Sequence, residues 1–297
     1  MIILLYLLRI KYILDSNKDK KLYIDILIIS FMDESEEWFE VIKLKDHLYI
    51  IRERLDEVEP RFLTKFTNIY LIIGTNKALL IDTGTGLYPL KPIIKKMIGA
   101  KELLVINTHS HFDHRGGNEE FEDIYIHESE LGNASMIFDI SFLKDSPKTR
   151  VQLFERRNFR YNPPHTLHPL KDGHEFDLGE LTVKVIHTPG HSVGSISLLT
   201  NQKELFTGDS AHFGAMYLPK KRKFPTMLSS LSILLDLFQE SDDIEIYPSH
   251  EDFQVKKVLL ESLIKGINDI ETIWDTKVKD KYLQAWVLND GNFTYII

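Results

Sequence analysis

Beyond residue 40 the chain consists of short apolar stretches separated by polar residues, glycine or proline. Many of these stretches are rich in Val, Ile, Leu and aromatic side chains and are bounded by turn residues, a pattern typical of β-strands. Short turns such as Lys45-Asp46 and Asn201-Gln202 join several of them into hairpins. We therefore predict strands at residues 41–52 (two strands), 68–73, 78–81, 181–186, 195–199, 204–206, 244–247, 286–288 and 293–295.

Three longer stretches carry apolar residues at helical spacing, and one short run is apolar throughout. The helical pattern covers residues 87–98, 227–238 and most of 253–273, and Gly99 is well placed to end the first helix. The apolar run at 103–106 predicts a central buried strand, with the polar residues after it at the edge of a sheet. Strands that gather into two sheets with helices outside predict a layered α/β architecture.

The N-terminal residues 1–31 differ from the rest of the chain. Arg9 and Lys11 interrupt the first apolar run well short of the roughly 20 residues that a membrane helix needs. No positively charged segment precedes this run and no small-residue cleavage site follows it, as a signal peptide requires. We therefore expect no stable membrane insertion, a non-domain extension at residues 1–31 and a single domain at residues 32–297. Our hypothesis is that Met32 is the natural start, and mass spectrometry of protein from its native host would contradict it by finding an intact Met1.

The 297 residues carry a formal net charge of −8 and include no cysteine. Nucleic-acid binding needs a concentrated basic surface, so the acidic balance argues against nucleic acid as the main partner. Without cysteine, disulfides, thiolate catalysis and cysteine-based zinc sites are excluded. The absence fits a cytoplasmic protein and leaves His, Asp and Glu as the ligands for any transition metal.

The segment THSHFDHRGG at residues 108–117 holds four potential metal ligands within a few positions. It follows the predicted buried strand and ends in two glycines. On a helix these side chains would point in different directions, whereas an irregular loop can direct two of them at one metal ion and two at another. Clustered imidazole and carboxylate groups are costly to bury unless a metal ion or a partner satisfies them. The four residues are His109, His111, Asp113 and His114.

Three further candidate ligands each follow a predicted strand and stand beside glycine or proline. His191 lies in HTPGHS, Asp209 in FTGDS and His250 in YPSH. The loops beyond strand ends are where open α/β sheets place their binding groups. One site between two sheets would therefore collect the whole set.

The motifs HSHFDH, TPGH, TGD and PSH resemble the motif series of the metallo-β-lactamase superfamily, and LIDTG at residues 80–84 resembles its first motif. The resemblance covers residues 40–255 and implies an α/β fold, the four-layer αβ/βα sandwich of that superfamily. It also implies two divalent metal ions bridged by Asp209, with Asp82 orienting one of the ligands. The first metal ion would be held by His109, His111 and His191, and the second by Asp113, His114 and His250.

Two divalent ions that share a ligand can also share a water molecule and lower its pKa towards neutrality. The resemblance implies that the resulting bridging hydroxide is the nucleophile of a hydrolysis. Asp113, as a ligand and acid–base group, is the candidate for passing a proton to the leaving group, and Asp209 is the second catalytic candidate. Zn²⁺ is the expected metal ion, with iron and manganese as alternatives.

Comparison with the branches of the superfamily reduces the number of substrate classes that the chain is expected to accept. True β-lactamases lack a bridging aspartate, nucleases carry a large insertion or a tRNA-binding arm, and flavin-linked diiron proteins add a flavodoxin domain. Glyoxalase II proteins share the ligands but add a helical C-terminal region that the residues after His250 only partly accommodate. The segments RERL at 52–55, IDTGTGL at 81–87 and HSHFDH at 109–114 most resemble the acyl-CoA thioesterase branch.

We therefore expect a small thioester or carboxyl-ester substrate, such as an acyl-CoA, with a lactone as the nearest alternative. A mononuclear iron persulfide dioxygenase is a rival from another class, because such relatives bind one iron through the equivalents of His109, His191 and Asp209. A non-catalytic binding protein is the third alternative, although none of the ligands is missing here. The expected partner is a small molecule, and the oligomeric state is left open.

Residues 136–168 and 211–226 are the segments that we expect to roof the metal ions. The second contains His212, a candidate pocket residue, and the basic run at 220–223, which suits either the anionic end of coenzyme A or a solvated loop. The first is rich in aromatic residues, which suit an acyl chain or a helix core equally. Its large apolar side chains are Phe138, Ile140, Phe142, Leu143, Phe154, Phe159 and Tyr161.

Overall fold

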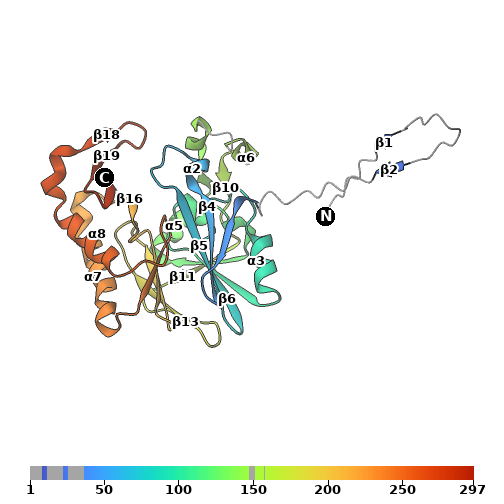
Figure 1. The fold of residues 1–297 in the computed structure, drawn as a ribbon, viewed down its shortest axis with the longest axis horizontal. Helices are drawn as coiled ribbons and strands as arrows, with labels where there is room; N and C mark the ends of the chain where they lie inside the picture. The colour runs from blue at the N-terminus through green and yellow to red at the C-terminus, as the bar shows by residue number, and fades with distance from the viewer. Residues whose placement is uncertain (1–8, 12–22, 26–36, 147–150, 157) are drawn as a thin grey trace.

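The computed structural model describes residues 9–11, 23–25, 37–146, 151–156 and 158–297, and from residue 37 onward the chain forms four layers (Figure 1). Helix α3 (Lys91–Ile98) covers one face of a seven-stranded sheet. A five-stranded sheet packs against the other face, and helices α7 (Phe224–Glu240) and α8 (Val258–Asn268) lie on its far side. The predicted α/β four-layer sandwich is therefore confirmed.

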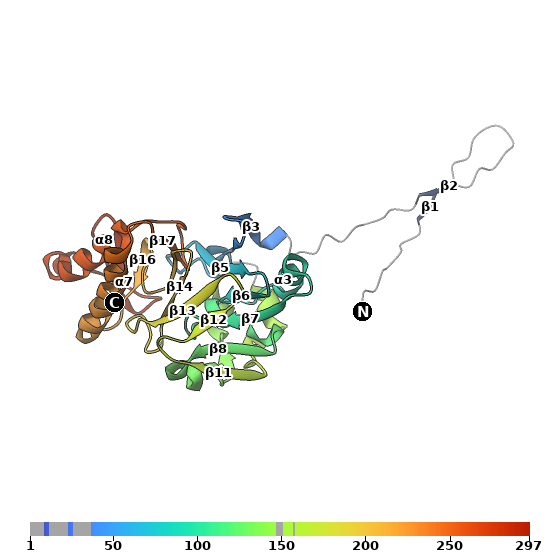
Figure 2. The ribbon, with the colours of Figure 1, turned by 90° about the horizontal axis from the view of Figure 1, so that it is seen from below.

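The seven-stranded sheet joins an antiparallel half to a parallel half. Its strands follow the order β11-β8-β7-β6-β5-β4-β3, which can be followed from bottom to top in Figure 2. Neighbours pair antiparallel from β3 to β6 and parallel from β6 to β11. The bounds are β3 (Glu40–Lys43), β4 (Leu48–Arg54), β5 (Phe66–Ile73), β6 (Lys77–Ile81), β7 (Glu102–Ile106), β8 (Asp123–His127) and β11 (Thr166–Leu170).

The five-stranded sheet follows the order β12-β13-β14-β15-β17. Its strands are antiparallel except for β15 and β17, which pair parallel. The carboxyl ends of β13, β15 and β17 consequently lie at the same edge of the sheet. The bounds are β12 (Glu175–Asp177), β13 (Thr182–His187), β14 (Ile196–Thr200), β15 (Glu204–Gly208) and β17 (Glu245–Pro248).

Three apolar cores separate the four layers, and strand alternation explains them. In β5, Tyr70 and Ile72 belong to the core between the two sheets, whereas Ile69 and Leu71 belong to the core beneath α3. On the second sheet, Leu205 of β15 faces the core under α7 and α8, and Phe206 faces the inter-sheet core. A strand buried on both faces therefore reads as a nearly continuous apolar run.

A further four-stranded sheet of order β16-β20-β19-β18 lies beside α7 and α8. The sequence predicts the hairpin of β19 (Ala285–Asn289) and β20 (Phe293–Ile296), and that hairpin is confirmed. It does not predict that β20 pairs in parallel with β16 (Gly214–Tyr217), which brings the C-terminal segment against the loop that follows Asp209. The outer strand is β18 (Val278–Asp280).

Short elements complete the described part of the chain. The short helices are α2 (Leu55–Val58), α4 (Phe112–Arg115), α5 (Leu131–Ala134) and α6 (Val151–Glu155), and β9 (Phe138–Asp139) pairs with β10 (Arg160–Tyr161). The 3-10 helices are η1 (Asn118–Glu120), η2 (Glu128–Glu130), η3 (Ser141–Asp145), η4 (Lys221–Lys223) and η5 (Ile270–Thr276).

Two predicted helices begin later than the sequence pattern suggests. The helix expected at 87–98 begins at Lys91, because Pro89 disfavours helical backbone at the residue before it. The helix expected at 253–273 begins at Val258, since Val255 forms a β-bridge with Ile246, and it continues after a break as η5. The predicted strands beyond residue 40 all form, with small differences at their ends.

The predicted extension at residues 1–31 lies outside the described residues, except for two short strands. These are β1 (Arg9–Lys11) and β2 (Tyr23–Asp25), which pair antiparallel with each other. The division at residue 32 stays a prediction. In the part of the chain that the structure describes, no helix is both long enough and apolar enough to cross a membrane.

Candidate metal centre

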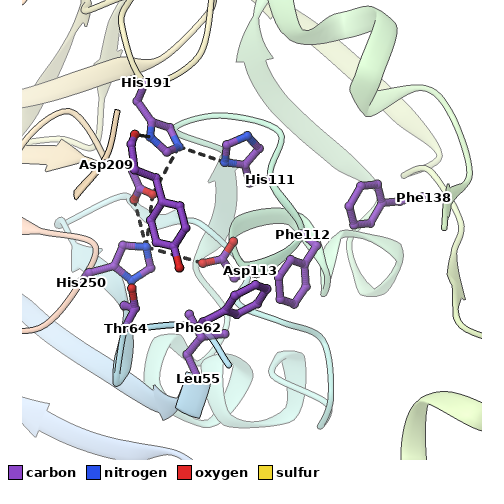
Figure 3. A pocket seen from close by; sticks show the side chains of 11 residues that line it. Leu55, Phe62, Thr64, His111, Phe112, Asp113, Phe138, His191, Asp209 and His250 are labelled. Carbon is purple, nitrogen blue, oxygen red and sulfur yellow. Dashed lines mark hydrogen bonds and ion pairs between the residues drawn. The ribbon is translucent and has the colours of Figure 1, made fainter. Parts of the chain in front are cut away.

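All seven candidate ligands lie together at one edge of the two facing sheets. His109 and its neighbours follow β7, and His191, Asp209 and His250 follow β13, β15 and β17. Figure 3 shows His191, Asp209 and His250 converging from three loops on His111 and Asp113, which share the segment after β7. The ends of four strands from two sheets therefore meet at one point, because both sheets direct the carboxyl ends of these strands to the same side.

The HSHFDH segment is not wholly an irregular loop. His109 and His111 lie in a loop, whereas Asp113 and His114 lie on the single turn of α4. The first glycine after this segment has a steric role. A Cβ atom on Gly116 would lie 2.1 Å from the carbonyl oxygen of Thr85, so the glycine allows this segment to pack directly against the loop after β6.

The ligand atoms form two groups. The first cluster is His109, His111 and His191, and the second cluster is Asp113, His114 and His250. With Asp209 counted in the first group, the ligand atoms of each group lie within 4.8 Å of one another. In the first cluster His111 Nδ1 is 2.9 Å from His191 Nε2, and in the second His250 Nε2 is 3.5 Å from Asp113 Oδ2.

The carboxylate of Asp209 lies between the two clusters. Its Oδ2 is 3.4 Å from His191 Nε2 and 3.9 Å from His109 Nε2. Its Oδ1 is 3.2 Å from the Nε2 atoms of both His114 and His250. His250 Nε2 is also 3.2 Å from Oδ2. The carboxylate thus lies close to both clusters, as a ligand shared by two cations must.

Backbone and side-chain acceptors orient the histidine rings. His114 Nδ1 donates to Asp82 Oδ2 at 2.8 Å, and His191 Nδ1 donates to the carbonyl oxygen of Tyr217 at 3.0 Å. His250 Nδ1 donates to the carbonyl oxygen of Phe66 at 2.8 Å. These bonds leave each Nε2 directed at the centre of the site, as outer partners of metal-binding histidines commonly do. The backbone of Asp82 has a φ of 66°, an unusual value for a residue other than glycine.

Burial and the charges of neighbouring side chains set the pKa values of the candidate ligands. Burial and neighbouring histidines hold the pKa of His109 well below its usual range and lower the pKa of His111 to about 4. Burial alone would raise the pKa of Asp113, but His114 and His250 lower it to about 2. The two carboxylates in turn outweigh burial at His250 and raise its pKa to about 9. Carboxylates likewise outweigh burial at His114 and raise its pKa. The site therefore combines ionised carboxylates with two imidazoles that bind protons tightly.

Three buried polar atoms at the centre have no hydrogen-bond partner among the described residues. They are His109 Nε2, His114 Nε2 and Asp209 Oδ1. Buried polar atoms of this kind usually have partners, so their clustering here needs an explanation. A set of imidazole nitrogens and carboxylate oxygens suits divalent transition metals. The residues present therefore fit the divalent cations that the motifs imply.

A cavity of about 210 Å³ opens directly onto the two clusters. Leu55, Phe62, Phe112 and Phe138 form its apolar wall, and Figure 3 shows Phe62 and Phe112 beside Asp113 with Phe138 beyond Phe112. The sequence pattern did not predict that Leu55, Phe62 and Phe112 line the cavity. Phe62 is an aromatic residue in the polar segment between β4 and β5, outside any strand. An apolar side chain in such a position is a signal that could have indicated a role in binding.

The two segments expected to roof the metal ions contribute less than predicted. From residues 136–168 only Phe138 lines the cavity, and the buried residues Ile140, Leu143, Phe154 and Tyr161 belong to the core beneath the first sheet. From residues 211–226 Tyr217 lines the cavity. His212 is buried beside His250 and does not line it, and burial lowers the pKa of His212 to about 4.

The basic run lies on η4 and is not part of the cavity wall. Lys221 Nζ is 2.7 Å from Glu271 Oε1 and 2.9 Å from the centre of the Trp274 ring. Arg222 and Lys223 are exposed. The prediction that this run binds the anionic end of a substrate therefore stays a prediction.

Known proteins resemble the chain in sequence and in fold. The family model described as the metallo-beta-lactamase superfamily matches residues 64–250. The acyl-coenzyme A thioesterase MBLAC2 of Homo sapiens is 30% identical over 233 residues, which cover 72% of this chain and 81% of the relative. Its counterpart from Gallus gallus is 33% identical over 194 residues, covering 61% and 68%. A metallo-beta-lactamase structure from Pontibacter korlensis aligns with a TM-score of 0.56 at 17% identity, over 78% of this chain and 99% of that chain.

The matches agree with the geometry of the site. The family model spans more than half of the chain and includes all seven candidate ligands, from the loop before β5 to His250. The solved structure supports the fold alone, because its sequence identity is low. The chain therefore belongs to the metallo-beta-lactamase superfamily and is a hydrolase related to the branch of the acyl-CoA thioesterases.

Proposed function

We infer that this protein is a dinuclear metal-dependent thioesterase that hydrolyses acyl-CoA-like substrates. The observation that carries the proposal is Asp209, whose carboxylate lies between the clusters, 3.4 Å from His191 in one and 3.2 Å from His250 in the other, beside an apolar cavity. His109, His111 and His191 would hold one ion, and Asp113, His114 and His250 the other. Zn²⁺ suits this mixture of imidazole and carboxylate ligands, with iron and manganese as alternatives.

Two divalent ions in this position would supply Lewis-acid activation of a water molecule and of the substrate carbonyl group. The residues of the chain have complementary tasks. Asp113 lines the cavity, and its low pKa keeps it an ionised carboxylate. In that form it can accept a proton from the attacking water and return it to the sulfur as the carbon–sulfur bond breaks. The products of this step are a carboxylic acid and a thiol.

The hydroxyl of Tyr217 is a second polar group at the cavity. It is buried close to the backbone of Leu63, and burial raises its pKa, so it remains a neutral group that can donate its proton in a hydrogen bond. A hydrogen bond from this hydroxyl to the substrate carbonyl oxygen would stabilise the negative charge that develops there. The main-chain carbonyl of the same residue orients His191, so Tyr217 would serve the site with both groups.

The apolar wall supports the choice of an acyl substrate. Leu55, Phe62, Phe112 and Phe138 extend the cavity away from the charged clusters, as an alkyl or aryl acyl chain requires. The human and chicken relatives named acyl-coenzyme A thioesterases support a thioester bond at the reacting end. The substrate is therefore expected to place its acyl chain along this wall and its carbonyl carbon at the clusters.

A substrate panel tests this function. Purified protein supplied with Zn²⁺ or Mn²⁺ is assayed against acyl-CoA thioesters of several chain lengths, lactones and phosphodiesters. We expect the highest kcat/KM for thioesters. Turnover confined to phosphodiesters would contradict the proposal, and preference for lactones would support the nearest alternative.

Metal analysis of protein purified without added metal separates the two enzyme classes. Two divalent ions per chain are expected for the hydrolase. One iron per chain together with oxygen consumption on a persulfide would support the mononuclear dioxygenase instead.

A further inference from the structure

One buried carboxylate outside the ligand set lies between two of the ligand loops. Glu130 ends η2 and is 1% exposed. Its Oε2 accepts a hydrogen bond from Ser110 Oγ, and its Oε1 accepts from Ser192 Oγ at 2.7 Å and from the amide of Gly194 at 2.8 Å. A single side chain thus joins two loops that are far apart in the sequence.

The bonded residues are neighbours of first-cluster ligands. Ser110 stands between His109 and His111, and Ser192 directly follows His191. Among the described residues, Glu130 makes no hydrogen bond to a neighbour of a second-cluster ligand. The histidines of that cluster are oriented by Asp82 and by the carbonyl oxygen of Phe66. The hydrogen bonds of Glu130 are therefore specific to one of the two clusters.

The absence of a side chain at Gly194 allows Glu130 to pack against the loop at residues 191–194. A Cβ atom on that residue would lie 2.6 Å from Glu130 Cγ, closer than real Cβ atoms approach other heavy atoms. The hydroxyls of Ser192 and Ser195 are 2.8 Å apart and extend the hydrogen-bonded group within the second loop. The glycine and the serines make the 191–195 loop fit around the carboxylate.

We propose that Glu130 is a positioning residue for the first cluster, holding the 109–111 loop and the 191–194 loop together so that His111 Nδ1 and His191 Nε2 face one cation. The inference rests on the metal binding of the proposed function. Partners that orient metal ligands contribute to affinity, and removing one costs about tenfold to a hundredfold in metal binding. The loss should fall on the first cluster alone.

The test measures Zn²⁺ binding by the full chain in two backgrounds. His250→Ala disables the second cluster, and His111→Ala disables the first. In the His250→Ala background, adding Glu130→Ala should raise the zinc dissociation constant about tenfold to a hundredfold, measured by competition with a chelating dye. In the His111→Ala background the same change should alter the constant less than about twofold, which is within the range of context effects.

Glu130→Gln serves as the conservative variant. Its amide oxygen can still accept from Ser192 and Gly194, so it should recover a large part of the lost affinity. Visible absorption of the Co²⁺-loaded protein gives a second readout, because the spectrum reports ligand geometry. If Glu130→Ala does not fold, Ser192→Ala in the same two backgrounds removes one of the bonds and makes the same comparison.

Glu204→Gln is the matched control. Glu204 is also a fully buried glutamate, but it pairs with Lys45 and His47 at the opposite end of β15 from Asp209. The Glu204→Gln variant should lower the melting temperature without changing the zinc dissociation constant in either background. Equal weakening of both clusters by Glu130→Ala, or none, would overturn the positioning role. Absence of zinc binding by the unaltered protein would instead overturn the proposed function itself.

Discussion

Asp209 and Asp82 are both buried carboxylates at the site, but they meet different groups. Asp209 faces both clusters directly, whereas Asp82 touches the far nitrogen of His114 and the backbone amide of Thr108. Asp209→Ala should therefore lower kcat/KM far more than Asp82→Ala, because it leaves two cations facing each other with less negative charge between them. We expect about a tenfold to a hundredfold loss for Asp82→Ala.

The comparison is made at saturating Zn²⁺ with the metal content of each variant measured. If Asp82→Ala abolished activity while Asp209→Ala kept most of it, the assignment of the shared ligand would be wrong.

Glu53 predicts a pH dependence of stability. It is buried against Trp38 and Thr85, and burial raises its pKa to about 7 from a normal value of 4.5. Between these two values the unfolded chain releases the proton and the folded chain keeps it, so stability should fall as the pH rises from 4.5 to about 7 and then level off. The contribution is at most roughly 3 kcal/mol.

Urea unfolding of metal-free protein between pH 5 and 8 measures this effect, with pH steps of about one unit around the folded pKa. Glu53→Gln has no titrating group at this position, so its profile should lack the decline. Parallel profiles for the two proteins would show that the residue does not titrate in this range.

At the scale of elements, α4 depends on close contact with the loop after β6. Gly116→Ala would place a Cβ 2.1 Å from the backbone of Thr85, and this backbone cannot yield as a flexible side chain can. We expect the free energy of unfolding to fall by several kcal/mol. Zinc binding should also weaken, since Asp113 and His114 lie on α4. Gly132→Ala in α5 is the control, because its Cβ would meet nothing within 4 Å.

The control should be neutral or stabilising by about 0.5–1 kcal/mol, since alanine favours helical backbone. Both variants are compared by chemical unfolding and by zinc titration. Equal stability of the two would show that the loop contact is not tight in solution.

The 3-10 helix η4 allows a test of how the substrate is held. If its basic residues bind the anionic end of coenzyme A, Lys221→Glu with Arg222→Glu should raise KM for acyl-CoA and leave a small neutral thioester unaffected. Lys256→Glu with Lys257→Glu makes the same change of charge on another exposed surface and serves as the control. Equal effects on both substrates, or none, would mark the run as a solvated loop.

At the scale of the whole molecule, the metal centre joins loops from both sheets. Bound cations should therefore stabilise the entire fold by about 2.7 kcal/mol per site at a hundredfold excess over the dissociation constant. For a domain of this size that predicts a rise in melting temperature of about 5 °C or more. Differential scanning fluorimetry with chelator and with restored Zn²⁺ measures it, and Asp209→Ala should show a smaller rise.

The sequence alone determined a layered α/β architecture, the set of candidate ligands and most strands of the two facing sheets, although not β8, β11 and β12. The order of the four layers was implied by the resemblance to the superfamily. The reason is local. Apolar alternation follows directly from which side chains face a core, and each candidate ligand stands next to a strand end with its own glycine or proline. Such signals lie within a few residues of one another, as in the HSHFDH segment, and need no knowledge of distant parts of the chain.

The tertiary structure decided what depends on contacts between distant residues. Glu130 reaches Ser192 across 62 positions, and β16 pairs with β20 although neither pattern names its partner. The apolar wall combines Leu55 and Phe62 with Phe138 from another segment, and most of the aromatic residues predicted to roof the site form a core instead. Periodicity shows that a side chain is buried, but only packing decides which neighbour it meets, since many partners satisfy the same apolar pattern.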